Sequence, residues 1–136
     1  MGKQVTDAEY ARLLRLRTQL RRFEHWSTAR AAEHGLTASQ HQLLLAVRGH
    51  RESAGPTIGQ VADYLLIRHN SAVELCDRTE HAGLLRREPD ARDHRVVRLR
   101  LTAEGSRKLA LLSAAHLREL ASLAPLLEGL VLEGAE

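Results

Sequence analysis

The chain has 136 residues, enough for one domain and too few for a second, catalytic one. Aromatic residues make up only 3% of it while leucine and alanine dominate, which favours helices packed on helices over a β-sandwich or barrel. The net charge of +3 is a mild basic bias that allows a polyanionic partner without demanding one.

The first predicted element is one long helix over residues 8–34. Its apolar seam follows a 3-4-3 spacing through Leu13, Leu16, Leu20 and Phe23. Several arginines surround this seam, and scattered arginines on a helix most often form a solvated face. Gly35 stands where the helix is expected to end.

Two shorter helices follow, and each begins with a capping box. Thr37 and Gln40 have the spacing that starts the first helix, and Thr57 and Gln60 have the same spacing after a loop over residues 49–56. The second of these helices carries an apolar stripe formed by Ile58, Val61, Ala62 and Leu65. It is expected to brace the helix that comes next.

That next helix, predicted from about Arg68 to Gly83, has two contrasting faces. Positions i, i+3, i+4 and i+7 form a buried stripe of Ala72, Leu75, Cys76 and Thr79. The opposite face is polar and consists of Asn70, Glu74, Asp77 and His81. A polar helix face suits the major groove of DNA, which is about 12 Å wide and admits one helix.

A basic β-hairpin comes after this helix, with strands predicted near residues 84–88 and 96–101. In the second strand Val97, Leu99 and Leu101 alternate with a largely cationic face. Arg92 and Arg95 lie toward the hairpin tip, where they could reach a minor groove, whose negative potential favours arginine. A polar helix beside such a hairpin predicts a winged helix-turn-helix: mainly α with a small β-hairpin.

The C-terminal part is predicted to begin with a helix over about 103–123, capped by Thr102 and apolar nearly all round. Gly105 in its first turn would permit close approach of another backbone. Pro125 is expected to break this helix, with a last short helix after it. One chain of this size cannot cover the apolar surface of residues 8–26 and 109–132, which predicts a homodimer.

Signals for other functions are weak. The single cysteine excludes an internal disulfide framework and fits a reducing cytosol, so a cytoplasmic location is expected. No apolar run approaches the roughly 18 residues of a membrane span. The chain has no nucleophile elbow, phosphate loop or dinucleotide fingerprint, and its histidines lack metal-binding spacing. We therefore predict no catalytic residue, cofactor, metal site or membrane partner.

From Leu36 to about Leu123 the sequence resembles the MarR family of bacterial transcription regulators. The most specific part is an Asp-x-Arg wing followed at a fixed distance by Leu-Thr-x-x-Gly. The residues that carry the resemblance are Leu75, Asp77, Arg78, Gly83, Leu84, Asp93-His94-Arg95 and Leu101-Thr102-Ala103-Glu104-Gly105.

The resemblance implies a single MarR-like domain over residues 1–136. In it, residues 8–34 and 103–136 would form dimerisation helices around a winged helix-turn-helix DNA-binding lobe at 37–101. It further implies a sequence-specific transcriptional regulator, most simply a homodimeric repressor of a pseudo-palindromic operator. In the family, phenolic or other lipophilic ligands often adjust DNA affinity, and they bind where the dimerisation helices meet the lobe.

Candidate DNA-binding residues follow from these roles. Arg68, His69, Asn70 and Ser71 occupy the first turn of the recognition helix, where side chains reach base edges. Asn70 suits adenine and Arg68 suits guanine, although either could equally hold a phosphate. Arg78 is expected to contact the DNA backbone and so to position the protein on the duplex. On the wing, Arg92 and Arg95 are the predicted contacts, with Asp93 orienting Arg95.

Glu74 is the unusual member of the set, because a carboxylate facing DNA repels phosphate. It is expected either to accept a hydrogen bond from a cytosine amino group or to pair with an arginine such as Arg78.

Phe23, His25, Trp26 and His41 are candidates for lining a ligand site, with simple core packing as the alternative for the two aromatic residues. The main alternative function is a winged-helix module that makes protein contacts without specific DNA binding.

Overall fold

The computed structural model describes residues 2 and 4–132, and over these residues it is mainly helical. The helices are α1 (Asp7–Glu33), α2 (Ala38–Gly49), α3 (Ile58–Leu65), α4 (His69–His81) and α5 (Ala103–Leu132). The strands β1 (Leu85–Pro89) and β2 (Val97–Leu101) pair antiparallel. The prediction of a mainly α winged helix-turn-helix with a small β-hairpin is confirmed.

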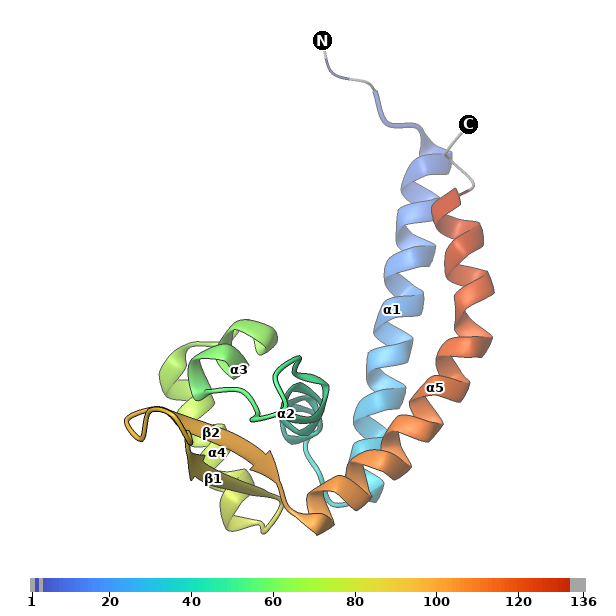
Figure 1. Cartoon of the computed structure of the whole chain (residues 1–136). Coiled ribbons are helices and arrows are strands. Elements are labelled where there is room, and N and C mark those ends of the chain that lie inside the picture. Colours follow the sequence, from blue (N-terminus) through green and yellow to red (C-terminus); the bar gives the residue numbers. More distant parts are fainter. Residues whose placement is uncertain (1, 3, 133–136) are drawn as a thin grey trace.

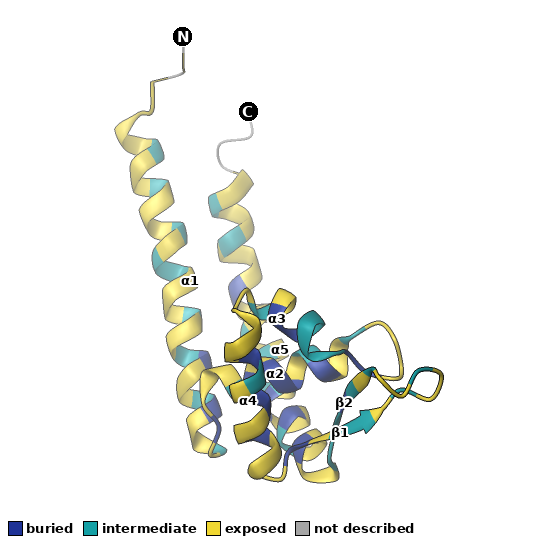
Figure 2. Cartoon of the chain, turned by 90° about the vertical axis from the view of Figure 1, so that its left-hand side faces the viewer, coloured by how far each residue is buried: buried dark blue, intermediate teal, exposed yellow. Residues whose placement is uncertain are grey.

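The molecule has two parts, an arm and a lobe. In the arm α1 and α5 lie side by side, so that the start of α1 and the end of α5 lie together at its far end (Figure 1). The lobe comprises α2, α3, α4 and the hairpin, and it lies at the base of the arm. Figure 2 shows that the buried residues gather in the lobe and its junction with the arm, whereas the arm itself is largely exposed.

Both predicted capping boxes are present. The hydroxyl of Thr37 accepts from the backbone N–H of Gln40 at 3.1 Å, and the Gln40 side chain accepts from the Thr37 N–H at 3.0 Å. Thr57 and Gln60 make the same pair of bonds at 3.2 and 2.9 Å. Each box satisfies two N–H groups that the first helical turn leaves without partners.

Helix α2 contributes to two hydrophobic cores because neighbouring leucines on it point in different directions, about 100° apart around the helix axis. Leu43 belongs to the core of the lobe, and Leu44 belongs to a second core between the lobe and the arm. The lobe core contains Leu43, Val47, Val61, Leu75, Cys76, Leu85 and Leu99. The junction core contains Ala31, Leu36, Leu44, Leu84, Leu109 and Leu112. This arrangement fixes the orientation of the lobe on the arm.

The start of α5 is bonded to the turn after α4. The Thr102 N–H donates to the Leu84 carbonyl at 3.1 Å, and the Thr102 hydroxyl donates to the Gly83 carbonyl at 2.7 Å. A Cβ at Gly105 would overlap the Leu84 carbonyl oxygen and lie 3.1 Å from its carbonyl carbon. The close backbone approach expected at Gly105 is therefore confirmed, and its partner is the entry to β1.

The expected break at Pro125 is wrong, since α5 continues through Pro125 to Leu132. Proline removes one N–H donor and leaves the carbonyl four residues earlier without its helical partner. That carbonyl belongs to Ala121, an exposed residue, so water can satisfy it. The end of the predicted C-terminal segment, residues 133–136, lies outside the described residues.

Candidate nucleic-acid interface

The recognition helix α4 is held by its apolar face. Ala72, Leu75, Cys76 and Thr79 are all buried, as the periodicity predicts. The Thr79 hydroxyl donates to the Leu75 carbonyl at 2.7 Å, so its polar atom is satisfied inside the core. The polar residues of the opposite face, Asn70, Glu74, Asp77 and His81, are exposed.

The first turn of α4 differs from those of α1, α2 and α3, which all begin with capping boxes. Its N-cap is Arg68, whose side chain makes no capping hydrogen bond. The exposed side chains of His69, Asn70 and Ser71 follow directly. Backbone N–H groups at this end are therefore available to an anion such as a phosphate, with the base-reading candidates beside them.

The carboxylates of α4 have different surroundings. Asp77 accepts from Arg87 of β1 at 2.5 Å, so its charge is neutralised from within the lobe. Glu74 is exposed, and in the described part of the chain it makes no ion pair with Arg78. The Arg78 pairing considered from the sequence is not formed, which leaves both side chains available to a partner.

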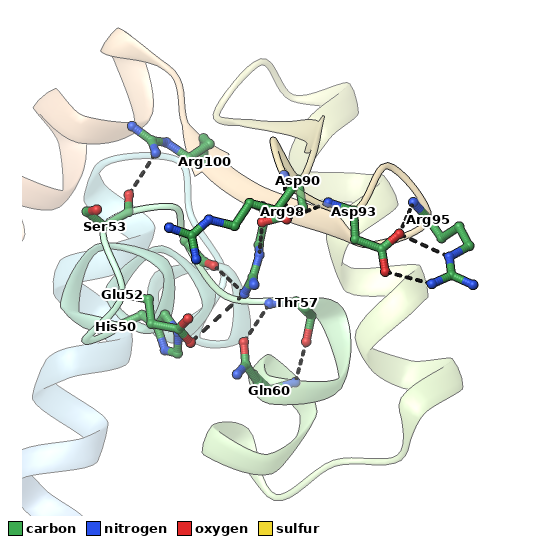
Figure 3. Close-up of polar contacts among 12 residues, drawn as sticks. His50, Glu52, Ser53, Thr57, Gln60, Asp90, Asp93, Arg95, Arg98 and Arg100 are labelled. Atoms are coloured by element: carbon green, nitrogen blue, oxygen red, sulfur yellow. Dashed lines mark hydrogen bonds and ion pairs between the residues drawn. The ribbon is translucent and has the colours of Figure 1, made fainter.

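At the wing tip, Asp93 and Arg95 form a two-pronged pair. Arg95 Nε and Nη2 donate to the two carboxylate oxygens of Asp93 at 3.0 and 3.1 Å, and the Arg95 N–H donates to Asp93 Oδ1 at 3.1 Å (Figure 3). These bonds from Arg95 lower the pKa of Asp93, which stays ionised at neutral pH. The Arg95 side chain is 90% exposed, so the pair orients it without burying it. The expected orienting role of Asp93 agrees with this geometry.

Asp90 holds the turn of the wing through hydrogen bonds. Its Oδ2 accepts from the backbone N–H groups of Asp93 and Arg92, both at 3.0 Å, and its Oδ1 accepts from Arg98 Nε at 3.1 Å. These bonds lower the pKa of Asp90. Sequence reasoning missed this residue, although an aspartate directly after a proline is a turn signal. The Arg92 side chain, a predicted contact, is exposed.

The cationic face of β2 turns toward the protein. Arg98 Nη1 donates to the Gly55 carbonyl at 3.3 Å, and Arg100 Nη1 donates to the Ser53 carbonyl at 2.7 Å (Figure 3). Between them, the Leu99 N–H donates to the Pro56 carbonyl at 2.8 Å. These bonds attach the loop between α2 and α3 to the hairpin, so Arg98 and Arg100 hold the wing.

Three of the four ligand candidates gather around His116 of α5, a residue that sequence analysis did not propose as a site residue. Its ring centroid lies 4.8 Å from that of Trp26, 4.7 Å from that of His41 and 5.9 Å from that of Phe23. The remaining candidate, His25, is exposed and lies with Trp26 along a shallow groove on α1. The cluster joins α1, α2 and α5 where the arm meets the lobe.

Hydrogen bonding sets the state of His116. Its Nδ1 lies 2.7 Å from the Leu112 carbonyl, which only accepts, so Nδ1 carries a proton. In the neutral ring Nε2 then accepts from the Ser27 hydroxyl at 2.6 Å. His41 is buried and its pKa is lowered, first by burial and second by His116. The His41 side chain is therefore uncharged at neutral pH.

Among the described residues, no group of three or more His, Cys, Asp or Glu side chains is placed to hold a metal ion. In the same part of the chain, no helix is long and apolar enough to cross a membrane.

Residues 34–96 match the sequence model of the MarR family. Over these residues the chain is similar to the MarR family. The matched segment covers the helices and most of the wing that form the candidate interface, and the prediction of this family is confirmed. No curated protein sequence matches the chain.

Solved structures of MarR proteins share the fold over most of the chain. A MarR family protein from Bacillus stearothermophilus matches with a TM-score of 0.73 and 22% identity over 98% of this chain and 86% of that one. AbsC, a MarR family transcriptional regulator from Streptomyces coelicolor, matches with a TM-score of 0.72 and 19% identity over 88% and 80%. A mutant of MepR from Staphylococcus aureus, solved bound to an oligodeoxyribonucleotide, matches with a TM-score of 0.67 and 19% identity over 90% and 84%.

Proposed function

We propose that this MarR-family chain is a sequence-specific, DNA-binding transcription regulator of the cytoplasm, acting as a homodimer and most simply as a repressor. One observation carries the proposal: the exposed polar face of α4 and the exposed, carboxylate-oriented Arg95 belong to the same lobe. A helix and a wing arranged in this way match a major groove and a neighbouring minor groove. The DNA-bound MepR structure shows that a protein of this fold can bind DNA.

The homodimer is supported by apolar side chains left exposed on the arm. They are Tyr10, Leu13, Leu14, Leu20, Leu111, Leu117, Leu120, Leu126, Val131 and Leu132. Many large apolar side chains left exposed on one part of a protein indicate an association site there. We therefore assign residues 8–34 and 103–136 to dimerisation and residues 37–101 to DNA binding, within one domain.

Sedimentation at micromolar concentration tests the dimer. The expected mass is about twice the 15.2 kDa of one chain. A folded, monomeric chain under these conditions would remove the basis for a two-fold symmetric operator. With a dimer, selection from random duplexes should return a pseudo-palindrome with half-sites about 10 to 10.5 bp apart, because two recognition helices then face one side of the duplex.

Within the interface, Asn70 and Arg95 are proposed to contribute differently. Asn70, on the outer face of α4, reads a base, whereas Arg95 contributes through phosphate proximity and minor-groove potential. Arg95→Ala should weaken operator and random DNA together and reduce the slope of log affinity against log salt by roughly one unit. Asn70→Ala should cost about 1 to 3 kcal/mol on the operator and leave random duplex almost unchanged.

Arg107→Ala is the matched control for Arg95→Ala. Arg107 also pairs with a carboxylate through Nε and Nη2, at 3.0 and 2.6 Å from Glu104, but it belongs to α5. The two variants therefore lose the same charge and the same kind of pair, and only Arg95→Ala should change the salt slope. Equal effects of the two variants, or none from Arg95→Ala, would favour the protein-contact function over DNA binding.

We also propose that a lipophilic or phenolic effector adjusts DNA affinity near Phe23, Trp26, His25 and His41. Trp26 is the only tryptophan of the chain, so its fluorescence reports on this place directly. Titration with hydroxybenzoates should change Trp26 emission and weaken operator binding over the same concentration range. A change in operator binding without a change in emission would place the effector elsewhere.

A further inference from the structure

A partly buried arginine of β2, Arg98, links the turn of the wing to the loop between α2 and α3. The Arg98 side chain is 18% exposed and that of Asp90, its partner at 3.1 Å, is 16% exposed. The same guanidinium donates to the Gly55 carbonyl at 3.3 Å and lies 4.0 Å from Glu52 (Figure 3). Arg98 thus connects the wing tip, through Asp90, with the loop between α2 and α3.

Glu52 is itself held from the other side. His50 Nε2 lies 3.2 Å from Glu52 Oε1, and His50 Nδ1 lies 2.8 Å from the Tyr64 hydroxyl of α3. An ionised carboxylate only accepts, so Nε2 carries the proton, and in the neutral ring Nδ1 accepts from the Tyr64 hydroxyl. Two hydrogen bonds and one ion pair at 4.0 Å therefore connect α3, the helix that braces α4, with Arg98.

Close backbone contact makes this attachment specific. Gly55 has φ +93°, and a Cβ there would overlap the carbonyl oxygen of Leu99 on β2. The loop can therefore lie against the hairpin only with glycine at this position. The Gly55 carbonyl is presented to Arg98 from this packed position.

We propose that Arg98 is a positioning residue for DNA binding: through Asp90 it holds the wing, and with it Arg95, at a fixed distance from the recognition helix. This inference rests on the proposed function and deepens it. Leu99 and Arg100 would still hold the base of the hairpin, but the turn organised by Asp90 would lose its attachment to the lobe and would sample more positions. DNA would then have to order the wing at the moment of binding, which lowers affinity without removing any contact to DNA.

Arg98→Lys tests the proposal because it keeps the charge but loses the planar fork that reaches Asp90 and Gly55 together. Operator affinity should fall roughly three- to tenfold, the cost of ordering a few wing residues on binding. The salt slope should stay at the parent value, because the same counterions are released once the wing is seated. Asp90→Asn should give the same signature, and Arg107→Lys, on α5, should leave affinity unchanged.

A double-mutant cycle shows whether Arg98 acts through the wing arginine. In an Arg95→Ala background, Arg98→Lys should weaken binding less than about twofold, since the side chain that it positions is absent. If Arg98→Lys lowered operator affinity by the same factor of roughly three to ten in that background, the proposal would be overturned. A slope reduced by about one unit in Arg98→Lys would also overturn it, because Arg98 would then contact phosphate itself.

Hydrogen exchange of the free protein tests the proposal without DNA. The N–H groups of Arg92 and Asp93 donate to Asp90, and that of Arg95 donates to Asp93. Arg98→Lys should speed exchange of the first two at least threefold and leave the amides of α4 at the parent rate. Unchanged exchange at Arg92 and Asp93 would overturn the proposal. If parent and variants alike fail to bind DNA while exchange changes as expected, the proposed function fails and the attachment of the wing stands.

Discussion

Gly105→Ala tests how the recognition helix is connected to the arm. A Cβ at this position would overlap the Leu84 carbonyl oxygen, which already accepts from the Thr102 N–H. To relieve the overlap, backbone must move by on the order of 1 Å, the difference from ordinary van der Waals separation. Both neighbouring segments are packed, since Leu84 belongs to the junction core and Gly105 is buried.

The magnitude follows from two opposing effects. Overpacking of a closely packed site costs about 1 to 3 kcal/mol. Replacing glycine by alanine in a helix returns about 1 kcal/mol or less, because alanine restricts the unfolded chain and has the higher helix propensity. We therefore expect a net loss of about 1 to 2 kcal/mol, which lowers Tm by roughly 3 to 10 °C for a chain of this length.

Gly129→Ala is the matched control in the same helix, because a Cβ at Gly129 would meet nothing within 4 Å. The same substitution should raise stability there by about 0.5 to 1 kcal/mol. Urea unfolding followed by circular dichroism at one fixed protein concentration measures both variants, since dimer stability depends on concentration. The reasoning is refuted if Gly105→Ala is as stable as Gly129→Ala, because the close approach would then have no energetic consequence.

Three further predictions concern single side chains. Burial raises the pKa of the Cys76 thiol to about 11, so little reactive thiolate is present at neutral pH. Operator binding should therefore resist peroxide in the parent and in Cys76→Ser alike. Reversible loss of operator binding in the parent alone would contradict this. The pKa of His41 is lowered in the folded chain. As pH falls below about 6.5, His41 takes up a proton in the unfolded chain, whereas in the folded chain it does so only at lower pH. The free energy of unfolding should therefore fall as pH falls through this range. His41→Phe should reduce that fall in urea unfolding measured between about pH 7.5 and 5, and an unchanged pH dependence would assign it to other groups. Pro125→Ala should stabilise the arm by about 1 to 3 kcal/mol in urea unfolding by restoring a helical N–H donor, and a loss of stability would indicate that α5 needs the proline.

Local chemistry made much of this protein predictable. The spacing of Thr37 to Gln40 is enough to mark a helix start, because both hydrogen bonds of a capping box form within one turn. The buried stripe of α4, including Cys76 and Thr79, could be predicted for the same reason, since helical periodicity alone decides which side chains share a face. The hairpin was predictable from the alternation of apolar and cationic residues in β2.

Contacts between distant segments were decided only by the tertiary structure. Alternation in β2 places Arg98 on a polar face but does not say whether that face meets DNA or the loop at Gly55, 43 positions earlier. The gathering of Phe23, Trp26 and His41 around His116 likewise depends on how α5 returns along α1. Pro125 was misjudged because the local rule counts the lost hydrogen bond, whereas solvent around Ala121 and packing along the arm decide its cost. Periodicity and capping act within one or two helical turns, and the free energy of a long-range contact depends on the position of both partners.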